Sequence, residues 1–434
     1  MDKDAQRIAE ACQQDPDLKN CFLEMLDITE SPLGTLDNGD DAEEAVISSI
    51  RKTGRELLKK WARKKAEDAK KLVADKAENR FHEKKKFIWQ TSIGKIEIVH
   101  ECFLRKKSKG ELSKRLKPLE DITGIKNKKY SIRCQKLMTD FGAEESFYQA
   151  AKRMKEHHGV DINPGTIRET TEKYARKASE AINRLPTRRE KSDQMIVEMD
   201  GEMVPLVEYE ESKDRRKTKR LLWSELRIGT VQNIGEVNWG YACSFESPDH
   251  LGQRIKVVMK RFGFYERTEV HSVGDGAKWI PEQGEKLAGA NFHHLIDLPH
   301  LCEYLNEAAS AWTENTKDEV KKFKKELFEG GIEKILEKLK TTTAPPQHEG
   351  LRKCIQYIEN RLGQFDYKNA KRKGLPIGSG KVESTHRSLI QKRLKKPGTW
   401  WLKSNAANMA DLRTLRANDG WYLLWERGFL KEAA

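Results

Sequence analysis

The order of short apolar segments between residues 194 and 305 constrains the fold of this chain more than any other feature. Strand-like segments, rich in β-branched and apolar residues, are expected at 194–197, 226–231, 237–245, 269–273 and 294–296. An amphipathic helix is expected at 251–262, and another begins after Asp297. The resulting order of three strands, helix, two strands and helix predicts a mixed sheet covered by helices.

Two of these strands end in an Asp-Gly pair, Asp200-Gly201 and Asp275-Gly276. The ends of strands are where α/β sheets place functional groups, because loops and backbone amides converge there. An Asp-Gly pair is also a common turn signal, which explains either pair on its own. A third acid, Glu383, falls in the first turn of a helix that Ser379 can begin, where a negative charge also suits the helix dipole.

Three carboxylates that meet in space repel one another unless a cation neutralises them. Oxygen ligands of this kind suit Mg²⁺ or Mn²⁺, which keep positions open for water and phosphate oxygens. Two such ions can activate an attacking oxygen and stabilise a leaving one. The spacing of Asp200, Asp275 and Glu383 does not by itself decide between this chemistry and the turn and dipole roles.

The segment GLPIGSGKVESTHRSLIQKRLKKPGTWW (residues 374–401) resembles the signature around the third acid of bacterial insertion-sequence transposases. The resemblance is closest to the family named for the Kra element, a branch of the DDE transposases. It covers about residues 87–425 and is most specific from Asp275 onward. Other segments that resemble the family pattern occur in the family's order: WSELRIGTV (223–231), GDGAKWI (274–280), LIDLPHLCEYL (295–305), YIENRLGQFDY (357–367) and NAANMADLR (405–413).

This resemblance implies that Asp200, Asp275 and Glu383 form a catalytic triad that binds two Mg²⁺ or Mn²⁺ ions. The implied reaction is cleavage of DNA at the ends of a mobile element, followed by strand transfer into target DNA. Relatives that pair two DNA ends work as homo-oligomers, so at least a dimer is expected on DNA. Asp297 and His300 are placed beside the site, where they could support a carboxylate or the DNA, or cap and pack a helix.

The whole chain is expected to be an α+β protein with several domains. The resemblance implies an RNase H-like catalytic domain at 191–305 and 370–434, interrupted by a helical insertion at 306–369. Before it, residues 1–85 are predicted to be helical and match no known pattern, and residues 86–190 to form a hairpin and a helix-turn-helix-like pair.

The helix-turn-helix-like pair carries recognisable start and stop signals. Ser146 can cap the first helix and Gly159 can end it, and Asn163 can cap a second helix with Pro164 at its first position. Such a pair suits a recognition helix in a major groove, although helix pairs with tight turns are also common packing units.

The net charge of +14 makes a polyanion the expected partner, although a basic enzyme that never meets nucleic acid has the same charge. Trp400 and Trp401 could stack on a splayed base or belong to the core. The residues expected to contact DNA are basic and form three groups: Arg168, Lys173 and Arg176; Arg215, Arg216, Lys219 and Arg220; and Lys381, Arg387, Lys392 and Arg393.

The chain has no apolar run of about 18 residues, and its charged start does not look like a signal peptide. Its seven cysteines are scattered and contain no CxxC pair, which favours a reducing compartment and argues against a zinc site. The expected location is therefore the bacterial cytoplasm, on the nucleoid when the protein is bound to DNA.

Other functions fit many of the same features. The chain could be a catalytically silent DNA-binding relative of a transposase, or an RNase H-like nuclease that cuts without strand transfer. A helical interaction protein, whose charge serves solubility alone, would lack both DNA binding and cleavage. The presence of all three acids favours an enzyme.

Overall fold

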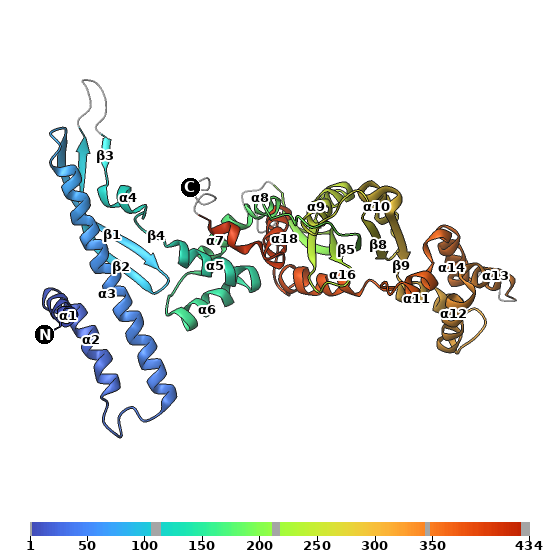
Figure 1. The fold of residues 1–434 in the computed structure, drawn as a ribbon, viewed down its shortest axis with the longest axis horizontal. Coiled ribbons are helices and arrows are strands. Elements are labelled where there is room, and N and C mark those ends of the chain that lie inside the picture. The colour runs from blue at the N-terminus through green and yellow to red at the C-terminus, as the bar shows by residue number, and fades with distance from the viewer. Residues whose placement is uncertain (1, 106–113, 211–217, 343–347, 427–434) are drawn as a thin grey trace. The chain divides into compact units, whose positions relative to one another are not determined.

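The computed structural model describes residues 2–105, 114–210, 218–342 and 348–426 (Figure 1). The chain divides into two compact units, residues 1–171 and 172–434, and the division falls inside helix α7 (Pro164–Ala175). None of the helices in the described ranges combines the length and the apolar character needed to cross a bilayer.

The first unit joins helices to a small sheet whose strands lie in the order β3-β2-β1-β4. Its core packs α3 against the β1–β2 hairpin through Ala62, Phe87, Ile96 and Ile98. The elements are α1 (Lys3–Gln14), α2 (Pro16–Thr29), α3 (Gly39–Ala74), β1 (Asn79–Thr91), β2 (Gly94–Arg105), β3 (Lys114–Leu116), α4 (Pro118–Thr123) and β4 (Lys129–Tyr130).

The boundary of the N-terminal helical region was predicted too late in the chain. Helix α3 ends at Ala74, and β1 already begins at Asn79, so residues 79–85 are strand and not helix. This part of β1 is charged and mostly exposed, so it lacks the alternation of apolar and polar residues that predicts a strand. Its pairing with β2, from Asn79 opposite Arg105 onward, decides its conformation.

The predicted helix-turn-helix-like pair is present as α6 (Phe147–His158) and α7, preceded by α5 (Ile132–Glu144). The Ser146 hydroxyl accepts a hydrogen bond from the Gln149 amide at 3.2 Å, and Gly159 ends α6 in a left-handed conformation. A buried cluster that includes Met138 and Met154 holds the three helices together. The expected start and stop signals of α6 are confirmed.

The second unit is built on a five-stranded sheet in the order β7-β6-β5-β8-β9. Strands β5, β8 and β9 are parallel neighbours, whereas β6 pairs antiparallel with both β5 and β7. The expected mixed sheet is therefore present. Its strands are β5 (Gln194–Tyr209), β6 (Lys219–Asn233), β7 (Gly240–Ser244), β8 (Glu269–Gly274) and β9 (Phe292–Ile296).

Two expectations about this sheet are wrong. Asp200-Gly201 does not end β5, which runs on to Tyr209 because alternate residues such as Val204 and Leu206 remain buried while β6 stays paired with it. A helix, α10 (Trp279–Ala288), separates β8 from β9 and was not expected. Its Pro281 and Gly284 weaken the helical pattern in the sequence, although Ile280 and Gln283 are buried.

Helices cover both faces of the sheet. Met195, Val197 and Met199 of β5 point toward α9 (Pro248–Arg261) and α10, where they form one buried core. The other face of β5 meets α16 (Gly380–Thr385), and α18 (Lys403–Ala417) contacts β7 and β5. Because side chains alternate along a strand, Glu198, Asp200 and Glu202 lie on this second face.

The expected helical insertion follows β9 and has its own buried core, which includes Leu301, Phe323, Ile335 and Ile358. The last part of the chain returns to the sheet through α16, a π-helical turn and α18. The helices not yet located are α8 (Ala178–Asn183), α11 (Leu298–Ala309), α12 (Thr316–Gly330), α13 (Ile332–Thr341), α14 (Glu349–Glu359), α15 (Tyr367–Arg372) and α17 (Lys392–Leu394).

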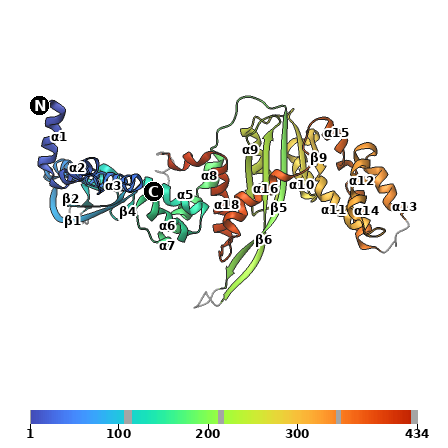
Figure 2. The same ribbon diagram turned by 90° about the horizontal axis from the view of Figure 1, so that it is seen from below.

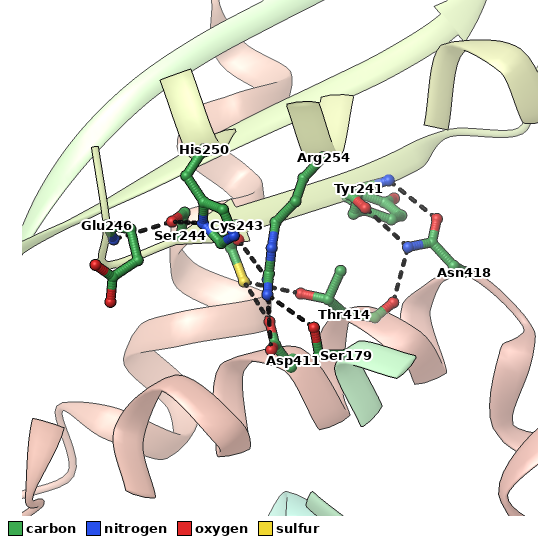
Figure 3. A network of polar contacts seen from close by, with 10 residues as sticks. All are labelled: Ser179, Tyr241, Cys243, Ser244, Glu246, His250, Arg254, Asp411, Thr414 and Asn418. Atoms are coloured by element: carbon green, nitrogen blue, oxygen red, sulfur yellow. Dashed lines mark hydrogen bonds and ion pairs between the residues drawn. The ribbon is translucent and has the colours of Figure 1, made fainter. Parts of the chain in front are cut away.

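A buried polar network fastens α9 and α18 to β7, the strand at one edge of the sheet (Figure 3). Arg254 of α9 forms an ion pair with Asp411 of α18 and donates a hydrogen bond to the Cys243 carbonyl at 2.8 Å. The Asn418 side chain accepts a hydrogen bond from the Tyr241 amide and donates one to its carbonyl. These side chains thus form hydrogen bonds with backbone groups of β7 that have no neighbouring strand on that side.

Candidate active site

Three aspartates lie at one level across the three parallel strands: Asp275 and Asp297 directly follow β8 and β9, and Asp200 lies within the longer β5. Glu198 of β5 pairs with Val273 of β8, so two further residues along each strand bring Asp200 level with Asp275. Asp297 follows β9 at the same level, and its amide donates a hydrogen bond to the Gly274 carbonyl at 2.7 Å. Neighbouring strands are about 4.8 Å apart, so the register places the backbones of these aspartates side by side.

Asp200 is a half-buried residue inside β5 and not at its end. One carboxylate oxygen accepts a hydrogen bond from the Gly201 amide at 2.7 Å. The other lies 3.1 Å from Nε2 of His386, a buried residue that follows α16. The Asp200 side chain is therefore directed toward the segment that carries the third acid.

Asp275 begins the tight turn that its sequence predicts. Its side chain accepts a hydrogen bond from the Ala277 amide at 2.9 Å, and Gly276 has a φ of +84°. The helical insertion fixes this turn from outside, because Tyr357 donates a hydrogen bond to the Asp275 carbonyl and Arg361 donates one to the Gly276 carbonyl. A Cβ on Gly276 would lie 2.8 Å from Tyr357 and Arg361, so only glycine fits.

Glu383 reaches the same face of the sheet because two buried acids hold the start of α16. Glu198 accepts a hydrogen bond from the Val382 amide at 2.8 Å. Asp297 accepts one from the Ser379 amide at 2.6 Å and another from the Ser379 hydroxyl. Ser379 is the N-cap residue of α16, as expected, but its hydroxyl donates a hydrogen bond to Asp297 and does not cap the helix. The Glu383 side chain is exposed.

A π-helical turn, η4 (His386–Gln391), follows α16 directly. Its i to i+5 repeat sets His386 and Gln391 one turn apart, so both can reach a single partner. Glu202 is that partner: His386 Nδ1 lies 3.1 Å from one carboxylate oxygen, and Gln391 donates to the other at 2.6 Å. Lys395 donates to the same oxygen as Gln391 at 2.8 Å. Such turns are frequent at functional sites.

The pKa values in this cluster follow from burial and from opposite charge. Burial alone would lower the pKa of His386, but Asp200 and Glu202 outweigh it and raise that pKa to about 9. Burial opposes the contacts of Glu202 with His386, Lys395 and Gln391, yet these contacts lower its pKa to about 2. Burial raises the pKa of Glu198 to about 7 despite its backbone hydrogen bonds.

The donor chemistry of Asp200, Asp275 and Glu383 suits a hard divalent cation, because all three offer carboxylate oxygens. In the described part of the chain, no three His, Cys, Asp or Glu side chains gather closely enough to hold a metal ion. Asp200 instead faces His386, and Glu383 extends into solvent. The backbone thus brings two of the acids to neighbouring strands and the third to a helix that packs on β5.

Asp297 and His300 have structural partners. Asp297 is buried, and its side chain accepts a hydrogen bond from the His300 amide at 3.0 Å. It therefore caps α11, which is one of the two roles predicted for it. The same carboxylate tethers Ser379, which connects α11 to the start of α16. His300 is half-buried, lies 3.5 Å from Glu303, and packs against Tyr304 and Tyr357.

The basic residues expected to contact DNA differ in their surroundings. Arg393 is 1% exposed and lies over the Trp401 ring, so its predicted surface role is wrong. Lys381 lies over the rings of Trp239 and Tyr241. Arg215 and Arg216 fall outside the described residues. The exposed members are Arg168, Lys173, Arg176, Lys219, Arg220, Arg387 and Lys392.

Sequence reasoning did not single out Glu198, Glu202 or His386, which complete the polar cluster. One signal was available, because Glu198, Asp200 and Glu202 alternate and so share one face of any strand that contains them. His386 lies three residues after Glu383, which places it near that acid on a helix, but its partners depend on the π-helical turn.

Sequence comparison places most of the chain in one family. Residues 38–424 match the uncharacterised protein family UPF0236. No curated protein matches the chain. This family match does not confirm a Kra-type assignment.

Among solved structures, the Drosophila P element transposase strand transfer complex aligns with 72% of this chain and 83% of that chain. The sequence identity is 9% and the TM-score is 0.28.

Proposed function

We propose that this chain, which belongs to the uncharacterised protein family UPF0236, is a DDE-type DNA transposase with Asp200, Asp275 and Glu383 as its catalytic acids. The observation that carries the proposal is the strand register, which sets Asp200 of β5 beside Asp275 at the carboxyl end of the parallel strand β8. The helix with Glu383 is tied to the same strand through Glu198. The motif order found in the sequence therefore corresponds to neighbouring positions in space.

The fold supports the finer assignments. The mixed sheet, the helical insertion after β9 and the return of the chain to the sheet through α16 fit an RNase H-like domain of the Kra-type transposases. DNA is the proposed partner, with at least a dimer acting on two element ends. The proposed location is the bacterial cytoplasm.

The carboxylates of Asp200, Asp275 and Glu383 would hold two Mg²⁺ or Mn²⁺ ions, which lower the pKa of a bound water and neutralise charge on the phosphate. The remaining residues hold this set in place. His386 holds the Asp200 side chain, Tyr357 and Arg361 hold the Asp275 turn, and Glu198 and Asp297 hold α16. This chemistry needs no serine or cysteine nucleophile.

The direct test is an assay of DNA cleavage on a duplex that carries the sequences flanking the gene. A transposase is expected to nick this DNA with Mg²⁺, to stop when EDTA is added, and to join the released 3′ ends to a second duplex. Nicked products without joined products would favour an RNase H-like nuclease. DNA binding without any nicking under Mg²⁺ or Mn²⁺ would favour a silent relative and contradict the proposal.

A further inference from the structure

The β5–β6 hairpin continues well beyond the rest of the sheet. β8 pairs with β5 only as far as Glu198, and β7 pairs with β6 only from Arg227 onward. Residues 201–209 and 219–226 therefore form a two-stranded arm, which Figure 2 shows running past the ends of the other strands. The arm starts one residue after Asp200, so it leads directly away from the candidate active site.

The two faces of the arm differ. On the face that Glu202 shares, Val204, Leu206 and Leu226 are buried, and Glu202 itself contacts the segment after α16. Cross-strand partners in an antiparallel pair share a face. The opposite face therefore carries four large side chains that are exposed by 41–55%: Met203, Tyr209, Leu221 and Trp223.

Trp400 extends this exposed row. The Val207 amide at the outer edge of β5 donates a hydrogen bond to the Trp401 carbonyl at 2.8 Å, which fixes this segment along the arm. Trp401 is buried, whereas Trp400 is 50% exposed, and the Lys219 ammonium lies 3.3 Å from the centre of its ring. We call the row formed by Met203, Tyr209, Leu221, Trp223 and Trp400 the aromatic stripe.

The charges beside the aromatic stripe suit an anionic partner. Lys219 lies on the stripe's face of the arm. Glu225 shares this face and forms an ion pair with Arg227. Glu208 points to the opposite face together with Arg220, which pairs with Glu210. Among the described residues, Lys219 forms no ion pair. Exposed aromatic rings next to such a cation are the combination that binds unpaired nucleic acid bases and their phosphates.

We propose that the aromatic stripe binds unpaired DNA bases beside the cleavage site, with the Trp223 and Trp400 rings stacking on bases. This inference rests on the proposed function, because it assigns a DNA contact to the strand that carries Asp200. Trp223 pairs with Pro205, five residues from Asp200, so it lies about 17 Å along the strand, on the face of the arm opposite to the Asp200 side chain. A DNA strand that reaches both must cross the edge of β5, so bases unpaired about five or more steps from the cut would contact the stripe.

The test compares the binding of two DNA probes, a duplex interrupted by a short oligo(dT) gap and the same duplex without a gap, in EDTA. The full chain is expected to prefer the gapped duplex. Trp223→Ala and Trp400→Ala should each reduce this preference by about 5- to 150-fold, the range for losing one stacked base. Trp223→Phe should keep most of it, and Tyr422→Ala, a 50% exposed aromatic outside the stripe, should leave it unchanged.

Three results would overturn the inference. The first is equal binding of both probes by the wild-type chain, and the second is an unchanged preference in both tryptophan variants. The third is a change from dimer to monomer in Trp223→Ala during sedimentation, which would make the stripe a contact between copies of the chain. Because binding is measured without metal, the two proposals can fail separately. If the stripe binds gapped DNA but the chain never cleaves DNA, the proposed function is contradicted and this inference stands.

Discussion

Two regions of the second unit place charged side chains in buried surroundings, and they do so in opposite ways. At the edge of the sheet, Arg254 and Asp411 form a matched pair whose remaining polar atoms contact Cys243 and Ser179 (Figure 3). Around Asp200 of β5 and the carboxyl ends of β8 and β9, acids outnumber bases, and His386 contacts both Asp200 and Glu202.

The difference separates a polar network that balances its own charge from one with an excess of acids, to which we assign the proposed function. The edge network neutralises its own charge and satisfies its donors, so it needs nothing from outside. The acidic cluster consists of Glu198, Asp200, Glu202, Asp275 and Asp297 on neighbouring strands, where like charges repel. His386 and Lys395 offset part of this repulsion, and the proposed cations would offset more of it.

Breaking the matched pair should have the largest effect on stability. Asp411→Ala leaves the Arg254 charge buried without its partner and should lower the free energy of unfolding by about 3–5 kcal/mol. The urea midpoint of the full chain measures this. Lys286→Ala, which removes a pair whose two side chains are both 61% exposed, should leave the midpoint unchanged. Equal midpoints for both variants would show that the network is not structural.

Removing an acid that holds the start of α16 should lower stability less than Asp411→Ala does. It should also reduce DNA cleavage, because it loosens the segment that carries Glu383. Asp297→Ala loses the cap of α11 and the two hydrogen bonds to Ser379, so unfolding should become easier by about 2–3 kcal/mol. Ser379→Ala keeps the cap and should destabilise the chain less. If Ser379→Ala also leaves DNA cleavage unchanged, the tether does not position Glu383.

The acidic cluster, unlike the edge network, should respond to divalent cations. Mg²⁺ at a hundred times its dissociation constant should stabilise the chain by about 2.7 kcal/mol, since it binds the folded state alone. Asp200→Asn should abolish this gain, whereas Asp249→Asn, a surface acid of the same unit, should retain it. A thermal melt with and without Mg²⁺ measures the gain, and an equal response of both variants would place the ion elsewhere.

The smallest effect is expected at the open edge of β7. Asn418→Ala removes the side chain that pairs with both backbone groups of Tyr241. Tyr241 is half-buried, so water can replace part of this pairing, and the cost should be about 1 kcal/mol. The Mg²⁺ response should not change, and a loss of that response would mean that the two regions are coupled.

The sequence predicted those parts of the fold whose local pattern agrees with their tertiary role. The strand β8, the helix α9 and the cap of α6 all follow from apolar periodicity and turn residues. The continuation of β5 past Asp200-Gly201 did not, because a turn signal was overridden by pairing with β6. Helix α10 was missed because Pro281 and Gly284 lie within it.

The site was predictable only in part. The three acids came from a resemblance in the segments around them, and their convergence on a metal remains a prediction. The partners that hold them come from different parts of the chain: His386 reaches Asp200 across 186 positions only because β5 and η4 pack together. Arg393 shows the converse error, because a basic residue in a charged segment is buried against Trp401.

The most direct test of the central claim is the effect of Asp275→Asn on Mg²⁺-dependent cleavage, with DNA binding measured in parallel. The account predicts that cleavage falls by at least about 10²- to 10³-fold, the size of effect for one lost group that stabilises the transition state. DNA binding should be retained, because the change removes a charge without changing the shape of the turn. Unchanged cleavage in this variant would contradict the assignment of the active site.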